Sequence, residues 1–206
     1  MIDDRLLVGK TTGPNQSEAM FNYGQLNRQR IRRQEKTVQL REEVKKASRS
    51  ADRKKIWLIL TEGWCGDVAQ NIPVIEKIAG ESVNITTLYI LRDENLELMD
   101  QFLTNGARSI PKLIALDAET HGVIGTWGSR LASAQELSYE LKARGVAKPL
   151  IMEELQRWYN ADKGQTIQTE FLKLIEQGEG SEQGEGNRFP RPGSDEIRAN
   201  SLFYNS

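Results

Sequence analysis

The chain has very little cysteine and histidine. Its 206 residues include one cysteine, Cys65, and one histidine, His121. No intrachain disulfide can form, and no His or second Cys lies near Cys65, so neither a zinc site made of protein ligands nor a Cys–His dyad is suggested. We therefore expect no metal and no cofactor. A lone thiol fits a reducing compartment, which predicts a cytoplasmic location.

Long apolar runs and an excess of one charge are also missing. The net charge is −1, which implies no global attraction to nucleic acid or to a membrane surface. No stretch approaches the roughly 20 apolar residues of a membrane span, and residues 1–12 do not form a convincing secretion signal. We expect no membrane partner, and the composition does not indicate an oligomeric state. Hydrophobic residues make up 38% of the chain, enough for one modest core.

The lone cysteine lies where an apolar run meets an amphipathic helix. Residues 56–60 are bulky and almost free of polar interruption, which predicts a buried strand. The apolar residues that follow recur at helical spacing: Val68, Ile72, Ile75 and Ala79. Cys65 is thus expected at the first turn of a helix, where free amide groups and the helix dipole favour a thiolate. Val68 stands where a two-cysteine redox helix carries its second thiol.

Two segments together resemble the thioredoxin family. Residues 64–68, Trp-Cys-Gly-Asp-Val, followed by Pro73, resemble the active-site turn and kinked helix of that family. Residues 106–114 resemble the loop and strand that carry its cis-proline, here Pro111. The resemblance covers about residues 56–130. It implies an α/β thioredoxin-like fold, a central mixed sheet flanked by helices, with added helices at both ends.

The resemblance also implies a chemistry, altered by two departures. Val68 replaces the second cysteine, and Ile59 replaces the buried acid that assists it in thioredoxins. What remains is monothiol exchange: Cys65 attacks a disulfide or thiol adduct, and an external thiol resolves the mixed disulfide. The implied partner is a disulfide-bearing protein or a low-molecular-weight thiol. The implied site comprises the nucleophile Cys65, the supporting residues Trp64, Gly66, Asp67 and Val68, and the groove residues Ile110, Pro111 and Trp127.

Activation of the thiol depends on two opposing effects. A helix N-terminus stabilises an anion by roughly 0.3–2 kcal/mol. The Asp67 carboxylate, if it lay about 6 Å away, would oppose the thiolate by roughly 0.7 kcal/mol in water and about 3 kcal/mol at an effective dielectric of 20. The sequence leaves this balance open. For Asp67, capping the helix is favoured over a general-base role.

Two further readings use other features. The chain can be a redox-inactive thioredoxin-fold binding module that uses the groove around Cys65 and Pro111. Alternatively, residues 17–55 can contact an acidic partner or nucleic acid, since residues 28–55 hold 12 Lys/Arg against 4 Asp/Glu, a surplus of 8. Few aromatics accompany these charges, and a charge run is usually a solvated face, so nucleic acid is not favoured. A shared iron–sulfur cluster is favoured less still.

The chain divides into five regions by composition and periodicity. We expect a flexible N-terminus at 1–16, a helical extension at 17–55 capped by Ser17, the thioredoxin-like core at 56–130, packed helices at 131–177 and a disordered tail at 178–206. Within the core the patterns predict strands at 56–61, 83–90, 112–116 and 122–127 and helices at 66–79 and 94–104. In the C-terminal region Ser133 and Glu136 suggest a capping box, Pro149 a first helical position, and Ile167, Phe171, Leu174 and Ile175 an apolar stripe.

Overall fold

A four-stranded mixed sheet forms the centre of the molecule. The structure is a computed structural model, and it describes residues 2–177. The strands are β1 (Lys55–Thr61), β2 (Ile85–Leu91), β3 (Lys112–Asp117) and β4 (Val123–Gly128), in the order β2-β1-β3-β4. β1 pairs in parallel with β2, whereas β1 with β3 and β3 with β4 are antiparallel. The predicted α/β thioredoxin-like architecture is confirmed, and all four strands lie where the sequence predicts them.

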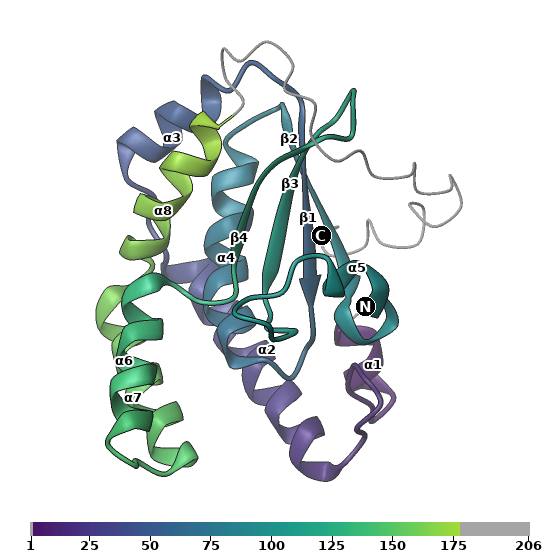
Figure 1. Cartoon of the computed structure of the whole chain (residues 1–206), viewed down its shortest axis with the longest axis vertical. Helices are drawn as coiled ribbons and strands as arrows, with labels where there is room; N and C mark the ends of the chain where they lie inside the picture. The colour runs from purple at the N-terminus through teal and green to yellow at the C-terminus, as the bar shows by residue number, and fades with distance from the viewer. Residues whose placement is uncertain (1, 178–206) are drawn as a thin grey trace.

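Helices cover both faces of this sheet (Figure 1). They are α1 (Ile2–Leu7), α2 (Glu18–Thr37), α3 (Glu42–Arg49), α4 (Gly66–Gly80), α5 (Leu96–Asp100), α6 (Ala132–Ala143), α7 (Lys148–Asp162) and α8 (Gln165–Glu176), with a short 3-10 turn, η1 (Arg92–Glu94). In Figure 1, α3, α4 and α8 lie on one side of the sheet and α5 lies on the other. Two apolar clusters match these two sides.

The larger cluster joins the sheet to the helices at both ends of the chain. Trp57 of β1 is fully buried, and the ring of Phe171 of α8 meets it edge-on at a centroid distance of 5.3 Å. The stripe predicted on α8 is buried: Ile167, Phe171, Leu174 and Ile175. The alternating β1 side chains reach the opposite cluster, where Leu60 packs near Val68, Met99 and Ile114. Ile59 is fully buried in the larger cluster.

Several local predictions differ from the structure. The helix predicted at 94–104 is reduced to η1 and the five residues of α5, and Leu103, beyond the end of α5, is 40% exposed. The capping box at Ser133 is wrong: Leu131 occupies the N-cap of α6, and the Ser133 hydroxyl is buried without a partner. Ser17 does occupy the N-cap of α2, although its side chain makes no capping bond.

The N-terminal residues are more firmly placed than a flexible segment would be. Thr11 and Thr12 are almost completely buried, and the Gln16 side chain bonds the backbone of Thr11 in both directions. The end of this segment therefore packs against the folded core, where the Thr12 hydroxyl accepts from the Gly63 amide. The disordered tail predicted at 178–206 lies outside the described residues.

Candidate active site

Cys65 occupies the N-cap position of α4, as its place in the sequence predicts. Its carbonyl accepts the first helical bond from the amide of Ala69, and its own amide donates to the carbonyl of Glu62. The residue is partly exposed. The turn therefore presents a thiol at the end of β1, where α4 begins.

The cis-proline loop lies directly opposite this thiol. The Ile110–Pro111 peptide bond is cis, as the resemblance implies. The Cys65 thiol donates a long, weak hydrogen bond to the carbonyl of Ile110, with Sγ 3.5 Å from the oxygen. Two segments 45 residues apart in the chain thus form the two sides of one site.

Asp67 is held by a buried arginine. Arg130 donates to both carboxylate oxygens, Nε to Oδ1 at 3.0 Å and Nη2 to Oδ2 at 2.6 Å. The Tyr159 hydroxyl donates to Oδ1 at 2.8 Å. Both members of the ion pair are largely buried. Asp67 lies in the first turn of α4, but the hydrogen bonds of its carboxylate go to Arg130 and Tyr159, so its role as a helix cap stays a prediction.

The surroundings of the sulfur favour the protonated thiol over the thiolate. Burial raises the pKa of Cys65 to about 12, and the Asp67 carboxylate adds to this increase. The amides of Val68 and Asp67 and the Arg130 guanidinium favour the thiolate, but they do not offset burial. The balance considered from the sequence set the helix N-terminus against Asp67. It did not include desolvation of the sulfur, which is the largest cause of the raised pKa.

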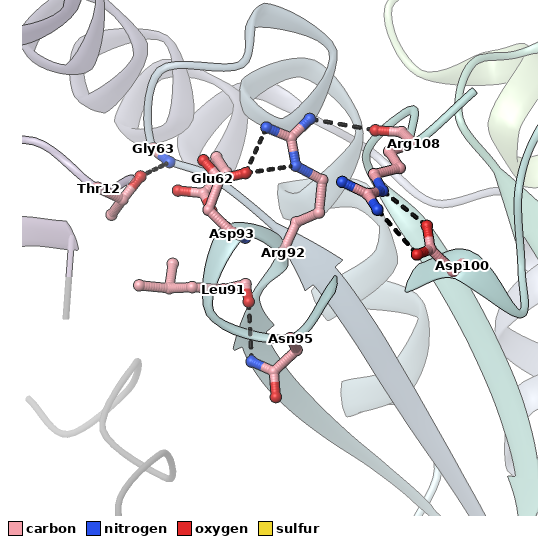
Figure 2. A network of polar contacts seen from close by, with 9 residues as sticks. All are labelled: Thr12, Glu62, Gly63, Leu91, Arg92, Asp93, Asn95, Asp100 and Arg108. Carbon is pink, nitrogen blue, oxygen red and sulfur yellow. Dashed lines mark hydrogen bonds and ion pairs between the residues drawn. The ribbon is translucent and has the colours of Figure 1, made fainter. Parts of the chain in front are cut away.

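A second arginine, Arg92, links Trp64, the residue before Cys65, to the loop that carries Pro111. The Arg92 guanidinium lies over the Trp64 ring at 5.1 Å from its centroid and donates to the carbonyl of Arg108 at 3.1 Å. Arg108 stands just before the cis-proline loop and pairs with Asp100 through both carboxylate oxygens (Figure 2). Arg92 also donates to Asp93. This network fixes Trp64 relative to the loop that carries Pro111.

The N-terminal segment contacts the same network. The Thr12 hydroxyl accepts a bond from the Gly63 amide at 2.7 Å, in the turn that leads to Cys65 (Figure 2). Glu62 of this turn is fully buried; its Oε1 accepts from the Asp93 amide, while Oε2 has no partner. Burial raises the pKa of the Glu62 carboxyl. A carboxyl therefore lies inside the fold three residues before the thiol.

The structure brings most of the predicted site residues together, with one exception. Cys65 and Trp64 pack against the cluster that contains Val68 and Ile110. Trp127 instead turns toward α8, where its ring meets Phe171 and its indole nitrogen donates to Glu170. His121 lies in the turn between β3 and β4, in the left-handed conformation.

The residues that sequence reasoning missed come from distant parts of the chain. Arg130, Tyr159 and Arg92 belong to no local motif, and no spacing signal links them to Cys65. Asn27 of α2 is the fourth: it is buried and donates to the carbonyl of Gly63 at 3.0 Å. Within residues 2–177 no group of His, Cys, Asp and Glu side chains is arranged to hold a metal ion. No described helix is long and apolar enough to cross a membrane.

Comparisons with known proteins agree with this arrangement. A family model described as thioredoxin matches residues 13–143. A crystal structure of a protein of unknown function from Pseudomonas aeruginosa is 16% identical, with a TM-score of 0.53, over 84% of this chain and 96% of that one. A crystal structure of an HIV epitope scaffold gives 16% identity and a TM-score of 0.55 over the same shares. These two likenesses concern the fold alone. Among curated proteins, the comparison finds no match.

Proposed function

Because the chain belongs to the thioredoxin family, we propose that it carries out monothiol thiol–disulfide exchange, with Cys65 as the nucleophile. The observation that carries this proposal is the position of the thiol at the start of α4, 3.5 Å from the carbonyl before the cis-proline. An extended substrate lying along Ile110 would place its sulfur against Cys65. The proposed substrate is a disulfide-bearing protein or the disulfide of a low-molecular-weight thiol.

The reaction balances with one external thiol. Cys65 loses its proton to solvent, and its thiolate attacks one sulfur of the substrate disulfide, which forms a mixed disulfide and releases the other half as a thiolate. A low-molecular-weight thiolate then attacks the mixed disulfide, restores Cys65 and leaves with the bound half as a new disulfide. The chain's single cysteine cannot perform this second step itself. The cycle needs a pool of reduced thiol, which is why we propose a cytoplasmic location.

The raised pKa makes this exchange slow at neutral pH. A pKa of about 12, well above that of an ordinary thiol, greatly lowers the thiolate fraction at neutral pH. The more basic thiolate is a better nucleophile, with a Brønsted slope near 0.5, which recovers about half of that loss on a logarithmic scale. The raised pKa therefore slows exchange at neutral pH relative to that of an exposed thiol.

A binding module is the second candidate, and the protonated thiol favours it. A groove formed by Cys65, Ile110 and Pro111 can receive an extended segment through backbone hydrogen bonds without any transfer of electrons. Val68 and Ile59 agree with this candidate too, because neither redox partner of the family is present.

Mixed-disulfide formation separates the two candidates. The folded protein is incubated at pH 8 with bis(2-hydroxyethyl) disulfide, and the adduct is followed by intact mass before and after addition of 2-mercaptoethanol. Exchange predicts an adduct that forms on the folded protein at a rate rising with pH and that the added thiol removes. An adduct that forms only in denaturant, at an ordinary thiol rate, would reject exchange and leave the groove as a binding surface.

A further inference from the structure

Helix α2 adds a charged side chain to the edge of the thiol site. α2 packs along α4, and the buried Asn27 fixes it to the turn before the thiol by donating to the carbonyl of Gly63. The amide oxygen of Asn27 accepts in turn from Arg30 Nη1 at 3.0 Å. The same asparagine thus bonds the active-site turn and positions the guanidinium of Arg30.

Arg30 lies over the residue that follows the cysteine. A Cβ atom built on Gly66 would be 3.7 Å from Arg30 Nη1, and no side chain from elsewhere in residues 2–177 would come closer to it. The glycine leaves the space between the guanidinium and the turn free of a side chain. The guanidinium therefore stands beside the start of α4, over the residue that follows Cys65.

This cation has no carboxylate partner within residues 2–177. Arg130, Arg92 and Arg108 each pair with an aspartate. Arg30 is half-buried and bonds only the neutral Asn27, and its pKa is lowered by burial and by the nearby Arg33. A partly desolvated cation without a counter-ion is unfavourable in the free protein, and an arriving anion would relieve this.

We infer that Arg30 binds a carboxylate of the substrate whose sulfur reacts at Cys65. This inference rests on the proposed function and deepens it, because it defines the substrate class as disulfides with a carboxylate a few atoms from the sulfur. The guanidinium has five N–H donors in a planar fork, of which Asn27 uses one, so a carboxylate can still be bound through two. Arg130 cannot replace Arg30 in this role, because both oxygens of Asp67 already occupy it.

Two alkylating reagents test this without requiring disulfide exchange. Iodoacetate and iodoacetamide have nearly the same shape and react with the same thiol, but only iodoacetate carries a carboxylate. Their rate constants at Cys65 are measured in the folded protein, and the ratio is divided by the ratio in urea-unfolded chain. We expect Arg30→Gln to lower this normalised ratio about five- to tenfold, since charges about 4 Å apart near a protein surface interact at this level or above. Arg30→Lys should keep most of it.

Lys36→Gln is the matched control, because it removes one exposed positive charge from the same helix. It should leave the ratio unchanged. Equal ratios in Arg30→Gln and the native protein, with the fold intact by circular dichroism, would overturn the inference. So would an equal loss in Lys36→Gln, which would indicate a general effect of net charge.

Disulfides then distinguish this inference from the proposed function and identify the source of the carboxylate. The folded protein is treated with 3,3′-dithiodipropionate, bis(2-hydroxyethyl) disulfide, and two cystine-linked peptides with Glu or Gln beside the cysteine. No adduct with any of them, together with an alkylation ratio that depends on Arg30, rejects the exchange and retains the anion site. An Arg30-dependent preference for dithiodipropionate alone assigns a small thiol acid, and one for the Glu peptide assigns an acidic protein segment.

Discussion

At the scale of single residues, the reactivity of Cys65 depends on two charges of opposite sign near its sulfur, those of Asp67 and Arg130. Asp67 raises the thiol pKa, and Arg130 lowers it, but the two form an ion pair, so their effects partly cancel. Burial then dominates and keeps the proton on the sulfur. Changing one member of the pair should therefore shift the pKa in a direction set by the charge that remains.

Replacing Asp67 by Asn should make Cys65 more reactive. The substitution removes the carboxylate that opposes the thiolate and leaves the Arg130 charge in place, so the thiol pKa falls from about 12. Below both pKa values the thiolate fraction rises tenfold for each unit of this decrease. We expect iodoacetamide to modify the variant about three to ten times faster at pH 8, a difference that disappears as pH approaches 12.

Glu42→Gln is the control for this change, since Glu42 also forms an ion pair, with Lys45, but on the surface of α3. Its alkylation rate should match that of the native protein. A rate for Asp67→Asn at or below the native value would mean that Asp67 does not oppose the thiolate.

Replacing Glu62 tests how its buried carboxyl affects the stability of the fold as a function of pH. Because its folded pKa is raised above the unfolded value, the protonated form is favoured in the fold. The stability that this group contributes is fully present below pH about 4.5 and is lost as pH rises through the raised pKa. Glu62→Gln removes this loss. The free energy of unfolding of the variant, relative to that of the native protein, should therefore increase by roughly 1–3 kcal/mol between pH 4 and pH 8.

Urea unfolding at several pH values measures this difference in the free energy of unfolding. Glu97→Gln changes an exposed carboxyl and should give a difference that stays flat over the same range. A flat profile for Glu62→Gln as well would show that the Glu62 carboxyl remains ionised at no cost to the fold.

At the scale of the elements, local patterns predicted what local forces determine. The four strands are short apolar runs, and α4 has apolar residues at helical spacing, so both were readable from the sequence. The cis-proline loop was identified through resemblance. Sequence reasoning failed where the chain responds to distant partners, because no local pattern carries that information.

The break between α2 and α3 shows why the sequence-based prediction failed there. The sequence predicted residues 17–55 as one helical region, but α2 ends at Thr37 and α3 begins at Glu42. The buried side chain of Gln168, in α8, accepts from the amide of Arg41 and donates to the carbonyl of Gln39. A residue more than 120 positions away thus forms hydrogen bonds with backbone groups that the break leaves without helical partners. The pair between Arg130 and Asp67 is likewise formed by residues far apart in the chain.

At the scale of the whole molecule, the C-terminal helices complete the core. The family match ends at residue 143, yet Ile167 and Phe171 of α8 are fully buried beyond it. The Lys55 amine, at the start of β1, donates to the carbonyl of Ile175. The segment beyond the family match therefore packs into the same hydrophobic core as the sheet, which predicts that the two unfold together.

Replacing Phe171 by Ala tests whether α8 and the sheet unfold together. The Phe171 ring lies edge-on against Trp57 at 5.3 Å and against Trp127 at 5.2 Å, so truncation leaves a cavity between α8 and the sheet. We expect a loss of about 3–5 kcal/mol in the free energy of unfolding, which is a large fraction of the stability of a typical domain. Urea unfolding followed by tryptophan fluorescence measures the loss, because both neighbouring rings are tryptophans. Leu150→Ala, on the exposed face of α7, should change the stability by no more than about 0.5 kcal/mol.

The shape of the transition decides between one unit and two. If α8 and the sheet unfold together, Phe171→Ala shifts a single transition to lower urea concentration, and fluorescence and far-ultraviolet circular dichroism shift by the same amount. If α8 were a separate appendage, the variant would release it alone, and circular dichroism would show an early partial loss of helix while the sheet unfolded at the native urea concentration. The buried contacts of Phe171 with β1 and β4 predict the single transition, in which loss of one ring on α8 also destabilises the strand that leads to Cys65.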